Sequence, residues 1–383
     1  MPRVVFLSTD SGMGGAEREV CHLAEEFQRR GWAVTAISML PLQSPIADLA
    51  SKGIRTYSLG MRLGVPDPRG LVRLGRILRR IRPDVLHAHM VHANLLARLS
   101  RLIAPTPVVI STIHNENEGA QWRYVAYRLT DRLADVTTAV SRVAQIEATR
   151  RGAAPAGTIR VVPNGLATRD FEPDEATRER MRVALDLGDR FTWLAVGRLA
   201  EAKGYGDMVA AFATALEARP GARLLIAGVG QLEDDIRSQI GRLGLEDSVR
   251  LLGPRSDVPA LMQAADGFLM TSRWEGLPMV LLEAGASGLP VVATDVGGSR
   301  DAVLDGVSGY VTPVADPARS ATAIGRVMAL PDADRRRMGE AGREHIRATF
   351  DIRAVCDTWE ALYRGARGGE QRAPRAFPPR LGG

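Results

Sequence analysis

The chain has 383 residues, more than one hydrophobic core usually organises, so we expect two globular domains. Its 45% hydrophobic and 25% charged residues exclude a disordered chain, and no apolar stretch reaches the roughly 18 residues that a membrane-spanning helix needs. The net charge of +6 is modest, and Cys21 and Cys356 have no partner spaced for metal or redox chemistry. The apolar run near the N-terminus is too short for a signal peptide, so the sequence predicts a cytoplasmic protein.

Short apolar, β-branched runs alternate with amphipathic helical stretches along the first part of the chain. The runs cover residues 4–7, 34–37, 85–87, 108–113, 136–140 and 159–162. This alternation predicts βαβ units and a parallel sheet. The first helix is expected to end at Gly31, because apolar residues from Ala16 to Phe27 recur at helical spacing up to that glycine.

A second series of runs follows a polar stretch at 167–190, which we interpret as the link between two domains. The runs cover 193–196, 224–227, 249–252, 268–271, 291–294 and 310–312. The sequence thus predicts a doubly wound domain at 1–166, onto which a helix at about 350–366 packs back, and a second at 167–349. Residues 367–383, rich in Gly, Pro and Arg, are expected to form a disordered tail. Ligands of open sheets bind beyond the carboxyl ends of the strands, so we expect a site in a cleft between the domains.

A glycine cluster, Gly12, Gly14 and Gly15, follows the first apolar run. It lacks the third glycine of a dinucleotide fingerprint, and no carboxylate follows the second run. It also lacks the lysine of a Walker loop, because the first lysine of the chain is Lys52. Backbone N–H groups at a helix start can still bind an anion, while a purely structural turn remains the alternative.

The stretch SRWEGLPMVLLEAGASGLPVVATDVGG, residues 272–298, is more specific. Pro278 suits the first position of a helix, which places Glu275 in the preceding loop and Glu283 within the helix. A carboxylate can accept hydrogen bonds from two hydroxyls, which suits a ribose diol at Glu283 and sugar hydroxyls at Glu275. N–H groups at the helix start would meet a diphosphate between them.

This stretch resembles the E-x7-E motif of the family-4 retaining glycosyltransferases. GGAE at 14–17 resembles the first loop of that family, VGRLAEAKG at 196–204 its phosphate clamp, and 225–236 with 249–272 its nucleotide-binding domain. The likeness covers nearly all of the chain before the tail. It implies the GT-B fold, an α/β architecture in which two Rossmann-like doubly wound domains face each other across a cleft.

The resemblance also implies an activity. A hexose or N-acetylhexosamine would move from a nucleotide diphosphate sugar to a saccharide or lipid-linked saccharide, in cell-surface polysaccharide or glycolipid synthesis; family frequency favours a UDP-sugar. A soluble small-molecule acceptor, a nucleotide-sugar epimerase and a noncatalytic nucleotide-sugar binding protein are the alternatives. The sugar, the nucleotide, the acceptor, the linkage and the oligomeric state are not readable from the sequence.

Site residues follow from the same resemblance. Arg198 and Lys203 match the cationic pair on the donor diphosphate, and Lys203 is one of only two lysines beside 48 arginines. A solvated loop charge is the alternative for Lys203. The predicted catalytic residues are His114, Glu275, Arg198 and Lys203, and the predicted donor-binding residues are Gly14, Gly15, Arg198, Lys203, Gly253, Pro254, Arg255, Glu275, Gly276, Leu277, Pro278 and Glu283.

No metal and no cofactor are expected. The resemblance implies front-face substitution, in which the departing phosphate takes the acceptor proton and no carboxylate nucleophile is used. The only Asp-x-Asp sequence begins at Asp332 and is predicted to cap a helix. His87, His89 and His92 are enough for a metal by count, but we expect them to line the acceptor side or cap a helix. Glu116 and Glu118 are interpreted as exposed charges at a helix start.

The segment from Leu71 to Pro83, LVRLGRILRRIRP, alternates apolar and arginine positions at helical spacing. Such a helix can lie on an anionic membrane, which would make the protein peripheral at the inner face of the plasma membrane. A packed helix with a solvated arginine face is the equal alternative. Nucleic acid binding is discounted, because no aromatic residues are interleaved with the charge.

Overall fold

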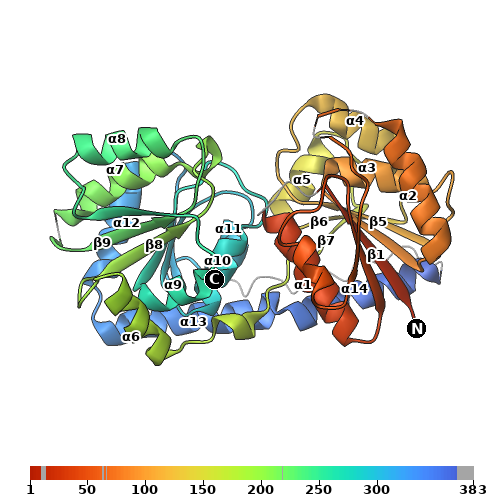
Figure 1. Cartoon of the computed structure of the whole chain (residues 1–383). Coiled ribbons are helices and arrows are strands. Elements are labelled where there is room, and N and C mark those ends of the chain that lie inside the picture. The colour runs from red at the N-terminus through yellow and green to blue at the C-terminus, as the bar shows by residue number, and fades with distance from the viewer. Residues whose placement is uncertain (10–13, 63, 66, 218, 369–383) are drawn as a thin grey trace. The chain divides into compact units, whose positions relative to one another are not determined.

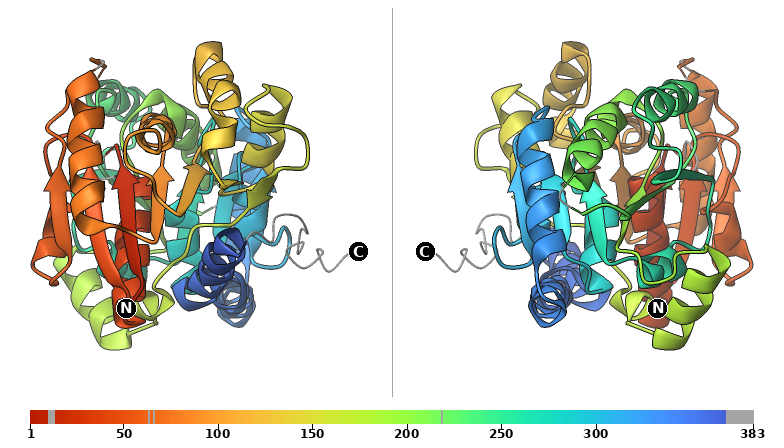
Figure 2. Two further views of the ribbon diagram at one scale, coloured as in Figure 1. Left: turned by 90° about the vertical axis from the view of Figure 1, so that its right-hand side faces the viewer. Right: turned by 90° about the vertical axis from the view of Figure 1, so that its left-hand side faces the viewer.

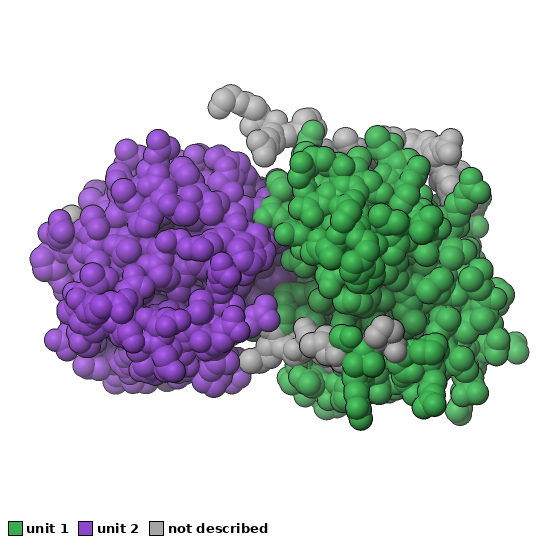
Figure 3. Space-filling view, turned by 90° about the horizontal axis from the view of Figure 1, so that it is seen from above, with its two compact units in different colours: residues 1–165, 352–383 green, residues 166–351 purple. Residues whose placement is uncertain are grey.

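The computed structural model describes residues 1–9, 14–62, 64–65, 67–217 and 219–368. The chain forms two compact units (Figure 3). The N-terminal unit comprises Met1–Gly165 with Ile352–Gly383, and the C-terminal unit comprises Leu166–Asp351. The tail predicted from residue 367 onward lies outside the described residues after residue 368.

The N-terminal unit contains a sheet of seven parallel strands, in the order β3-β2-β1-β4-β5-β6-β7 (Figure 1). The strands are β1 (Arg3–Ser8), β2 (Ala33–Ser38), β3 (Arg55–Ser58), β4 (Val85–His89), β5 (Val108–Ile113), β6 (Val136–Ala139) and β7 (Ile159–Val161). The helices are α1 (Gly15–Arg29), α2 (Pro68–Ile81), α3 (Val91–Ser100), α4 (Gln121–Leu129), α5 (Arg142–Arg150) and α14 (Ile352–Arg367). The short edge strand β3 has no counterpart among the predicted apolar runs.

Alternate side chains of the strands pack against different helices in this unit. Val5 and Leu7 of β1 share a core with Leu74 and Leu78 of α2. Phe6, between them, packs against Phe27 of α1, with 6.0 Å between the ring centroids. Helices α1 and α14 lie side by side (Figures 1 and 2), and the ring of Tyr363 of α14 stacks on Phe27. Both faces of the sheet are therefore covered, as the continuous apolar character of its strands requires.

The C-terminal unit contains six parallel strands in the order β10-β9-β8-β11-β12-β13. They are β8 (Thr192–Val196), β9 (Arg223–Ala227), β10 (Val249–Gly253), β11 (Gly267–Met270), β12 (Val291–Thr294) and β13 (Gly309–Thr312). The helices are α6 (Glu175–Ala184), α7 (Tyr205–Leu216), α8 (Glu233–Arg242), α9 (Val258–Ala264), α10 (Met279–Ala286), α11 (Ser299–Ala302), α12 (Pro317–Ala329) and α13 (Asp332–Phe350). Six apolar runs predicted these six strands.

The polar stretch interpreted as a link is instead part of the C-terminal unit, because it contains α6. Arg178 and Arg182 of α6 reach past α9 to the carboxylate of Asp266, at 2.6 and 3.3 Å. Arg178 also donates hydrogen bonds to the carbonyls of Gln263 and Ala265. Arginine side chains at this helix contact buried backbone, so the polar composition of the stretch reflects packing rather than a linker.

The strand order reverses at one place in each sheet. In the N-terminal unit this switch point lies between β1 and β4, and in the C-terminal unit between β8 and β11. Open parallel sheets bind ligands beyond the carboxyl ends of the strands at such a point. The loops that follow these four strands are therefore where a site is expected.

Candidate active site

The loop after β8 is held against the end of β11 by a glycine. Gly204 has φ +60°, and a Cβ there would collide with the carbonyl oxygen of Thr271, so a side chain is excluded on two grounds. The Thr271 hydroxyl donates a hydrogen bond to the Gly204 carbonyl at 2.9 Å. This close approach brings Lys203, the residue before the glycine, to the carboxyl end of β11.

Lys203 and Glu275 form an ion pair at this switch point. The Lys203 Nζ lies 2.5 Å from Glu275 Oε1, and the hydroxyl of Ser272 donates to the same oxygen at 2.8 Å. The side chains are 23% and 14% exposed, so the pair is shielded from solvent without being sealed. Two residues that sequence reasoning placed separately on the phosphate and on the sugar thus neutralise each other.

Arg198, the second predicted phosphate cation, is exposed in the same loop. No hydrogen bond or ion pair of its guanidinium occurs within the described part of the chain. The loop after β8 therefore contains Arg198, whose guanidinium has no partner among the described residues, and Lys203, which is paired with a carboxylate.

A second glycine, Gly297, packs against the backbone of the loop that carries Glu275. Gly297 has φ +49°, and a Cβ there would collide with the carbonyl oxygens of Glu275 and Gly276. The N–H of Gly298 donates to the Gly276 carbonyl at 2.7 Å. Backbone packing, rather than side chains, therefore sets the position of the predicted sugar-binding carboxylate.

Helix α10 begins one residue later than predicted, at Met279, so Pro278 occupies the N-cap position instead of the first helical position. Leu277 is buried at 5% exposure, and Gly276 and Pro278 are also buried. Glu283 lies within the helix, as the motif predicts, with a side chain that is 2% exposed. Its contact with a ribose diol stays a prediction.

The predicted donor-binding residues Gly253, Pro254 and Arg255 lie at the end of β10 and directly after it. Gly253 ends the strand with φ +69°, and its carbonyl accepts a hydrogen bond from the N–H of Gly228 at 2.8 Å. Pro254 is exposed. The Arg255 guanidinium is bound to Asp257 at 2.7 and 2.5 Å, and this carboxylate raises the pKa of Arg255. The backbone of this loop is thus the part left for a ligand.

In the N-terminal unit, the predicted phosphate loop leads into α1. Gly14 is the N-cap residue and Gly15 the first helical residue, while Gly12 lies outside the described residues. A Cβ on Gly14 would meet the carboxylate of Glu17, which lies in the first turn of α1, unless that side chain moved.

His114 follows the carboxyl end of β5 and is 7% exposed. Its Nε2 lies 2.9 Å from Nδ1 of His89, the last residue of β4. Burial lowers the pKa of His114 to about 4, so the ring is neutral near pH 7.

The expectation for the HAHMVH cluster is wrong for its first two members. His87 and His89 are fully buried and pack against each other, with 4.1 Å between their ring centroids and 34° between their ring planes, so neither lines a surface nor caps a helix. His92 lies in the first turn of α3. Burial lowers the pKa of both packed rings, which makes them neutral members of the core.

Glu118 was interpreted as an exposed charge, and the structure corrects this. It is 5% exposed, in the loop between β5 and α4, and one carboxylate oxygen accepts a hydrogen bond from the N–H of Asn115 at 3.3 Å. Burial, only partly offset by that hydrogen bond and by the charge of Arg123, raises the pKa of Glu118 to about 7.

We predict that this carboxyl makes stability depend on pH. Its folded pKa of about 7 exceeds the ordinary value of 4.5, so the neutral form stabilises the fold and this contribution is lost as pH rises between these values. From pH 4.5 to 8, the free energy of unfolding of the Glu118→Gln variant should rise by about 3 kcal/mol relative to wild type. Urea unfolding at both pH values measures the difference. Glu116→Gln is the control, and a Glu118→Gln profile parallel to wild type would contradict the prediction.

The apolar face of α2 is packed in the core rather than available to a membrane. Leu74 and Leu78 belong to the core of the N-terminal unit, and Ile77 and Ile81 pack against it. Arg76, Arg79 and Arg80 of the same helix are exposed. The packed helix with a solvated arginine face is therefore the alternative that the structure confirms.

In the described ranges, 1–9, 14–62, 64–65, 67–217 and 219–368, no three His, Cys, Asp or Glu side chains group as metal ligands do, and no helix has the length and apolarity to cross a membrane. The Asp-x-Asp sequence lies in the first turn of α13, where Asp332 pairs with Arg335 at 2.5 Å. It is a helix start rather than a cap.

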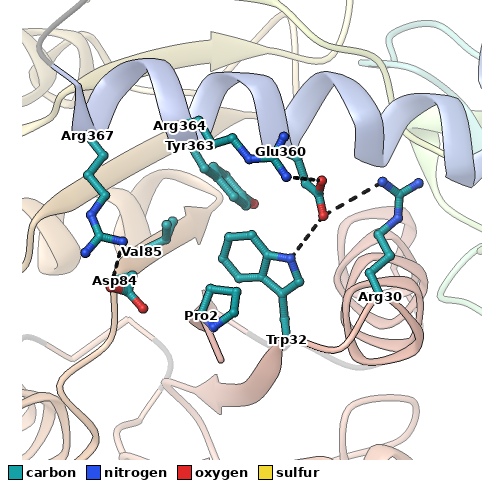
Figure 4. A pocket seen from close by; sticks show the side chains of 9 residues that line it. All are labelled: Pro2, Arg30, Trp32, Asp84, Val85, Glu360, Tyr363, Arg364 and Arg367. Atoms are coloured by element: carbon teal, nitrogen blue, oxygen red, sulfur yellow. Dashed lines mark hydrogen bonds and ion pairs between the residues drawn. The ribbon is translucent and has the colours of Figure 1, made fainter.

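A cavity of about 550 Å³ lies at the amino ends of β1, β2 and β4 (Figure 4). His114 follows the carboxyl end of β5, so it lies at the opposite end of the strands. Glu360 of α14 accepts hydrogen bonds from Trp32 at 3.0 Å and Arg364 at 2.9 Å, and Arg367 pairs with Asp84 at 3.1 Å. The charged groups that line this cavity bind one another. The cavity lies at the amino ends of the strands, so it is distinct from the predicted site at their carboxyl ends.

Comparison with known proteins agrees with this geometry. The model of "Glycosyltransferase Family 4" matches residues 13–170 and that of "Glycosyl transferases group 1" matches 177–345. A GDP-mannose-dependent phosphatidylinositol monomannoside mannosyltransferase of Mycolicibacterium smegmatis is 32% identical over 83% of this chain and 84% of its own length. The chain belongs to the family-4 glycosyltransferases.

Two other similar proteins match this chain over nearly its whole length. A glycogen synthase of Mycobacterium tuberculosis is 27% identical, covering 96% of this chain and 94% of its own. The structure of Anabaena HepE in complex with UDP-glucose has a TM-score of 0.84 and 22% identity, over 95% of this chain and 100% of that one. The GT-B fold predicted from the sequence is confirmed, and the protein is a glycosyltransferase.

Sequence reasoning missed the roles of two residues in the C-terminal unit and of one in the N-terminal unit. Ser272 shares an oxygen of Glu275 with Lys203, Gly297 supports the loop, and His89 holds His114. Ser272 and Gly297 stand at the two ends of the quoted motif, so a search of strand ends for hydroxyls and glycines could have found them. His89 had a weaker signal, its spacing of two residues from His87 on a strand.

Proposed function

We propose that this protein is a retaining, metal-independent glycosyltransferase that moves a hexose or N-acetylhexosamine from a nucleoside diphosphate sugar. The observation that carries the proposal is the pair of Lys203 and Glu275 at the β8–β11 switch point, with exposed Arg198 in the same loop. Two protein cations can neutralise a leaving diphosphate without a divalent ion. When the diphosphate takes Lys203, the carboxylate of Glu275 is released to accept sugar hydroxyls.

Membership of the family supports a retaining course. The departing phosphate takes the proton of the acceptor hydroxyl on the face that it leaves, so the new bond forms with the original anomeric configuration. In the N-terminal unit, the residues proposed to contact the donor are Gly14, Gly15 and His114. A neutral His114 suits a hydrogen bond to the donor sugar and adds no charge to the region of the leaving group.

Donor titration tests the proposal. The purified protein is titrated in EDTA with UDP-, GDP- and ADP-sugars, while heat release and free nucleoside diphosphate are followed. The panel includes GDP-mannose, which the name of the Mycolicibacterium relative gives as its donor, beside the UDP-sugars that the family frequency favours. Binding and turnover in EDTA with an α-linked product from an α-linked donor support the proposal. An inverted product, a requirement for a divalent cation, or conversion of the donor to its epimer without nucleotide release contradicts it.

We also propose a lipid-linked acceptor at an anionic membrane surface. The support is an exposed apolar ridge on α4, where Trp122, Val125 and Leu129 are 55%, 49% and 80% exposed at helical spacing. Exposed Arg128 and Arg132 lie beside it. Aromatic and aliphatic side chains flanked by arginine are typical of interfacial helices, and the acceptor named for the Mycolicibacterium relative is a phospholipid glycoside.

This surface predicts binding to vesicles. The protein should sediment with vesicles containing phosphatidylglycerol and not with pure phosphatidylcholine. Replacing Trp122 and Leu129 together by glutamate should lower the bound fraction at least about tenfold, because it removes buried apolar area and adds repulsion. Leu102→Glu changes a leucine that is 68% exposed outside α4 and serves as the control. Equal binding by the α4 variant and the control would contradict the proposal.

A further inference from the structure

We propose that His89 is a positioning residue that fixes the tautomer of His114, so that Nδ1 of His114 is a hydrogen-bond donor. The inference rests on the proposed function only for the ligand of that nitrogen, an oxygen of the donor sugar or its phosphate. It concerns a histidine with no contact to a substrate of its own, because His89 is fully buried.

The two rings are brought together by adjacent strands. β4 and β5 pair in parallel with His89 opposite Thr112, and His114, two residues after Thr112, directly follows β5. Nδ1 of His89 and Nε2 of His114 then lie 2.9 Å apart. Burial keeps both rings neutral near pH 7, so a single proton lies between the two facing nitrogens.

The location of that proton follows from the other nitrogen of His89. Nε2 of His89 is buried and has no hydrogen-bond partner among the residues that the structure describes. If His114 were the donor, the proton of His89 would sit on this nitrogen as a buried N–H without an acceptor. Such orphaned donors are rarer than buried acceptors that lack a donor. His89 therefore donates from Nδ1, and the proton of His114 lies on its own Nδ1.

The ring of His89 is also held in this orientation by His87. His87 packs against it, and His87 is itself fixed at both nitrogens, by the hydroxyl of Tyr363 at 2.8 Å and that of Thr112 at 2.7 Å. Tyr363 comes from α14, so the last helix of the chain supports this histidine pair. A ring locked in this way can impose its tautomer on a more exposed neighbour.

A functional consequence follows for His114. With its Nε2 accepting from His89 and a proton on Nδ1, the neutral ring has no free lone pair. It can donate to a hydroxyl or phosphate oxygen, and it cannot act as a general base. This agrees with a reaction in which the leaving phosphate takes the acceptor proton.

Nitrogen NMR tests the tautomer without any substrate. The protein has six histidines, so ring-labelled histidine gives a simple long-range ¹H–¹⁵N correlation spectrum, in which the signals of His114 are those lost in His114→Gln. We expect a protonated Nδ1 and an unprotonated Nε2 for His114. A protonated Nε2 in the wild-type protein would overturn the proposal, whether or not the enzyme turns over any donor.

A matched pair of variants tests the role of His89. His89→Asn keeps a group that can donate at the place of Nδ1, whereas His89→Asp, of the same size, can only accept. The Asp variant should move the proton of His114 to Nε2 and lower kcat about tenfold or more, with the Kd for the nucleoside diphosphate unchanged, while the Asn variant stays within about threefold of wild type. Equal losses of kcat in the Asn and Asp variants would overturn the positioning role, and the Asn and wild-type spectra still decide the tautomer if the Asp variant does not fold.

Discussion

Replacing Lys203 by methionine is expected to lower kcat/KM for sugar transfer by about 10²- to 10³-fold. Methionine keeps the length and apolar stem of the side chain but removes the ammonium, so negative charge that develops on the leaving diphosphate loses one of its two cations. The Ser272 hydroxyl still donates to Glu275, so the loop should keep its position. Initial rates with the donor found by titration give the effect.

The chain offers a matched control, because it has only one other lysine. Lys52 also forms an ion pair, with Glu25 at 2.6 Å, but its side chain is 53% exposed and lies far in the sequence from the predicted site. Lys52→Met should change the rate by less than about twofold. The double variant Lys203→Met, Glu275→Gln tests whether the pair acts as a unit, since its loss should be smaller than the product of the two single losses. Similar rates for the two lysine variants would refute the phosphate-clamp assignment.

Replacing Gly297 by alanine is expected to destabilise the C-terminal unit by about 3 kcal/mol and to abolish turnover. The new Cβ would meet the carbonyl oxygens of Glu275 and Gly276 and adopt a positive φ, so the loop that carries Glu275 must move. Urea unfolding and initial rates measure the two effects.

Gly306→Ala separates the backbone strain from the collision. Gly306 has φ +76°, and no heavy atom of the described residues lies within 4 Å of its ideal Cβ. Its substitution should cost about 1 kcal/mol of stability and leave the rate unchanged. If both variants lose the same stability and keep their activity, the collision at Gly297 is not what positions Glu275.

The sequence predicted those strands that are buried on both faces. Runs such as 108–113 are rich in apolar, β-branched residues and are buried along their whole length, because helices cover both sides of the sheet, and they correspond closely to the observed strands. β3 was missed because its residues, RTYS, lie at the sheet edge and are exposed or half-buried, so that no apolar run marks it. The polar stretch around α6 was misread for a related reason, since its arginines bind backbone carbonyls rather than water.

The chemistry of the candidate site was predictable, but its pairings were not. Lys203 and Glu275 were each identified from a local motif, yet their contact depends on the positive φ of Gly204 and on strand order. His89 was missed because β4 was predicted to end at His87, whereas it continues two residues further. That extension puts both histidines on one face of a strand, and alternation along a strand then makes their rings pack against each other. Glu118 was misjudged because burial of a loop carboxylate leaves no signal in local sequence.

The division of the chain into units has a consequence for synthesis on the ribosome. The C-terminal unit is continuous, whereas the N-terminal unit is completed by α14 at the end of the chain. Val355, Cys356, Trp359 and Tyr363 of this helix are buried, and the rings of Phe27 and Tyr363 stack. One face of the N-terminal sheet therefore lacks α14 until the entire C-terminal unit has been translated. The first unit to begin synthesis is thus the last to finish folding, and the histidine pair beside His114 gains its tyrosine only when the final helix has left the ribosome.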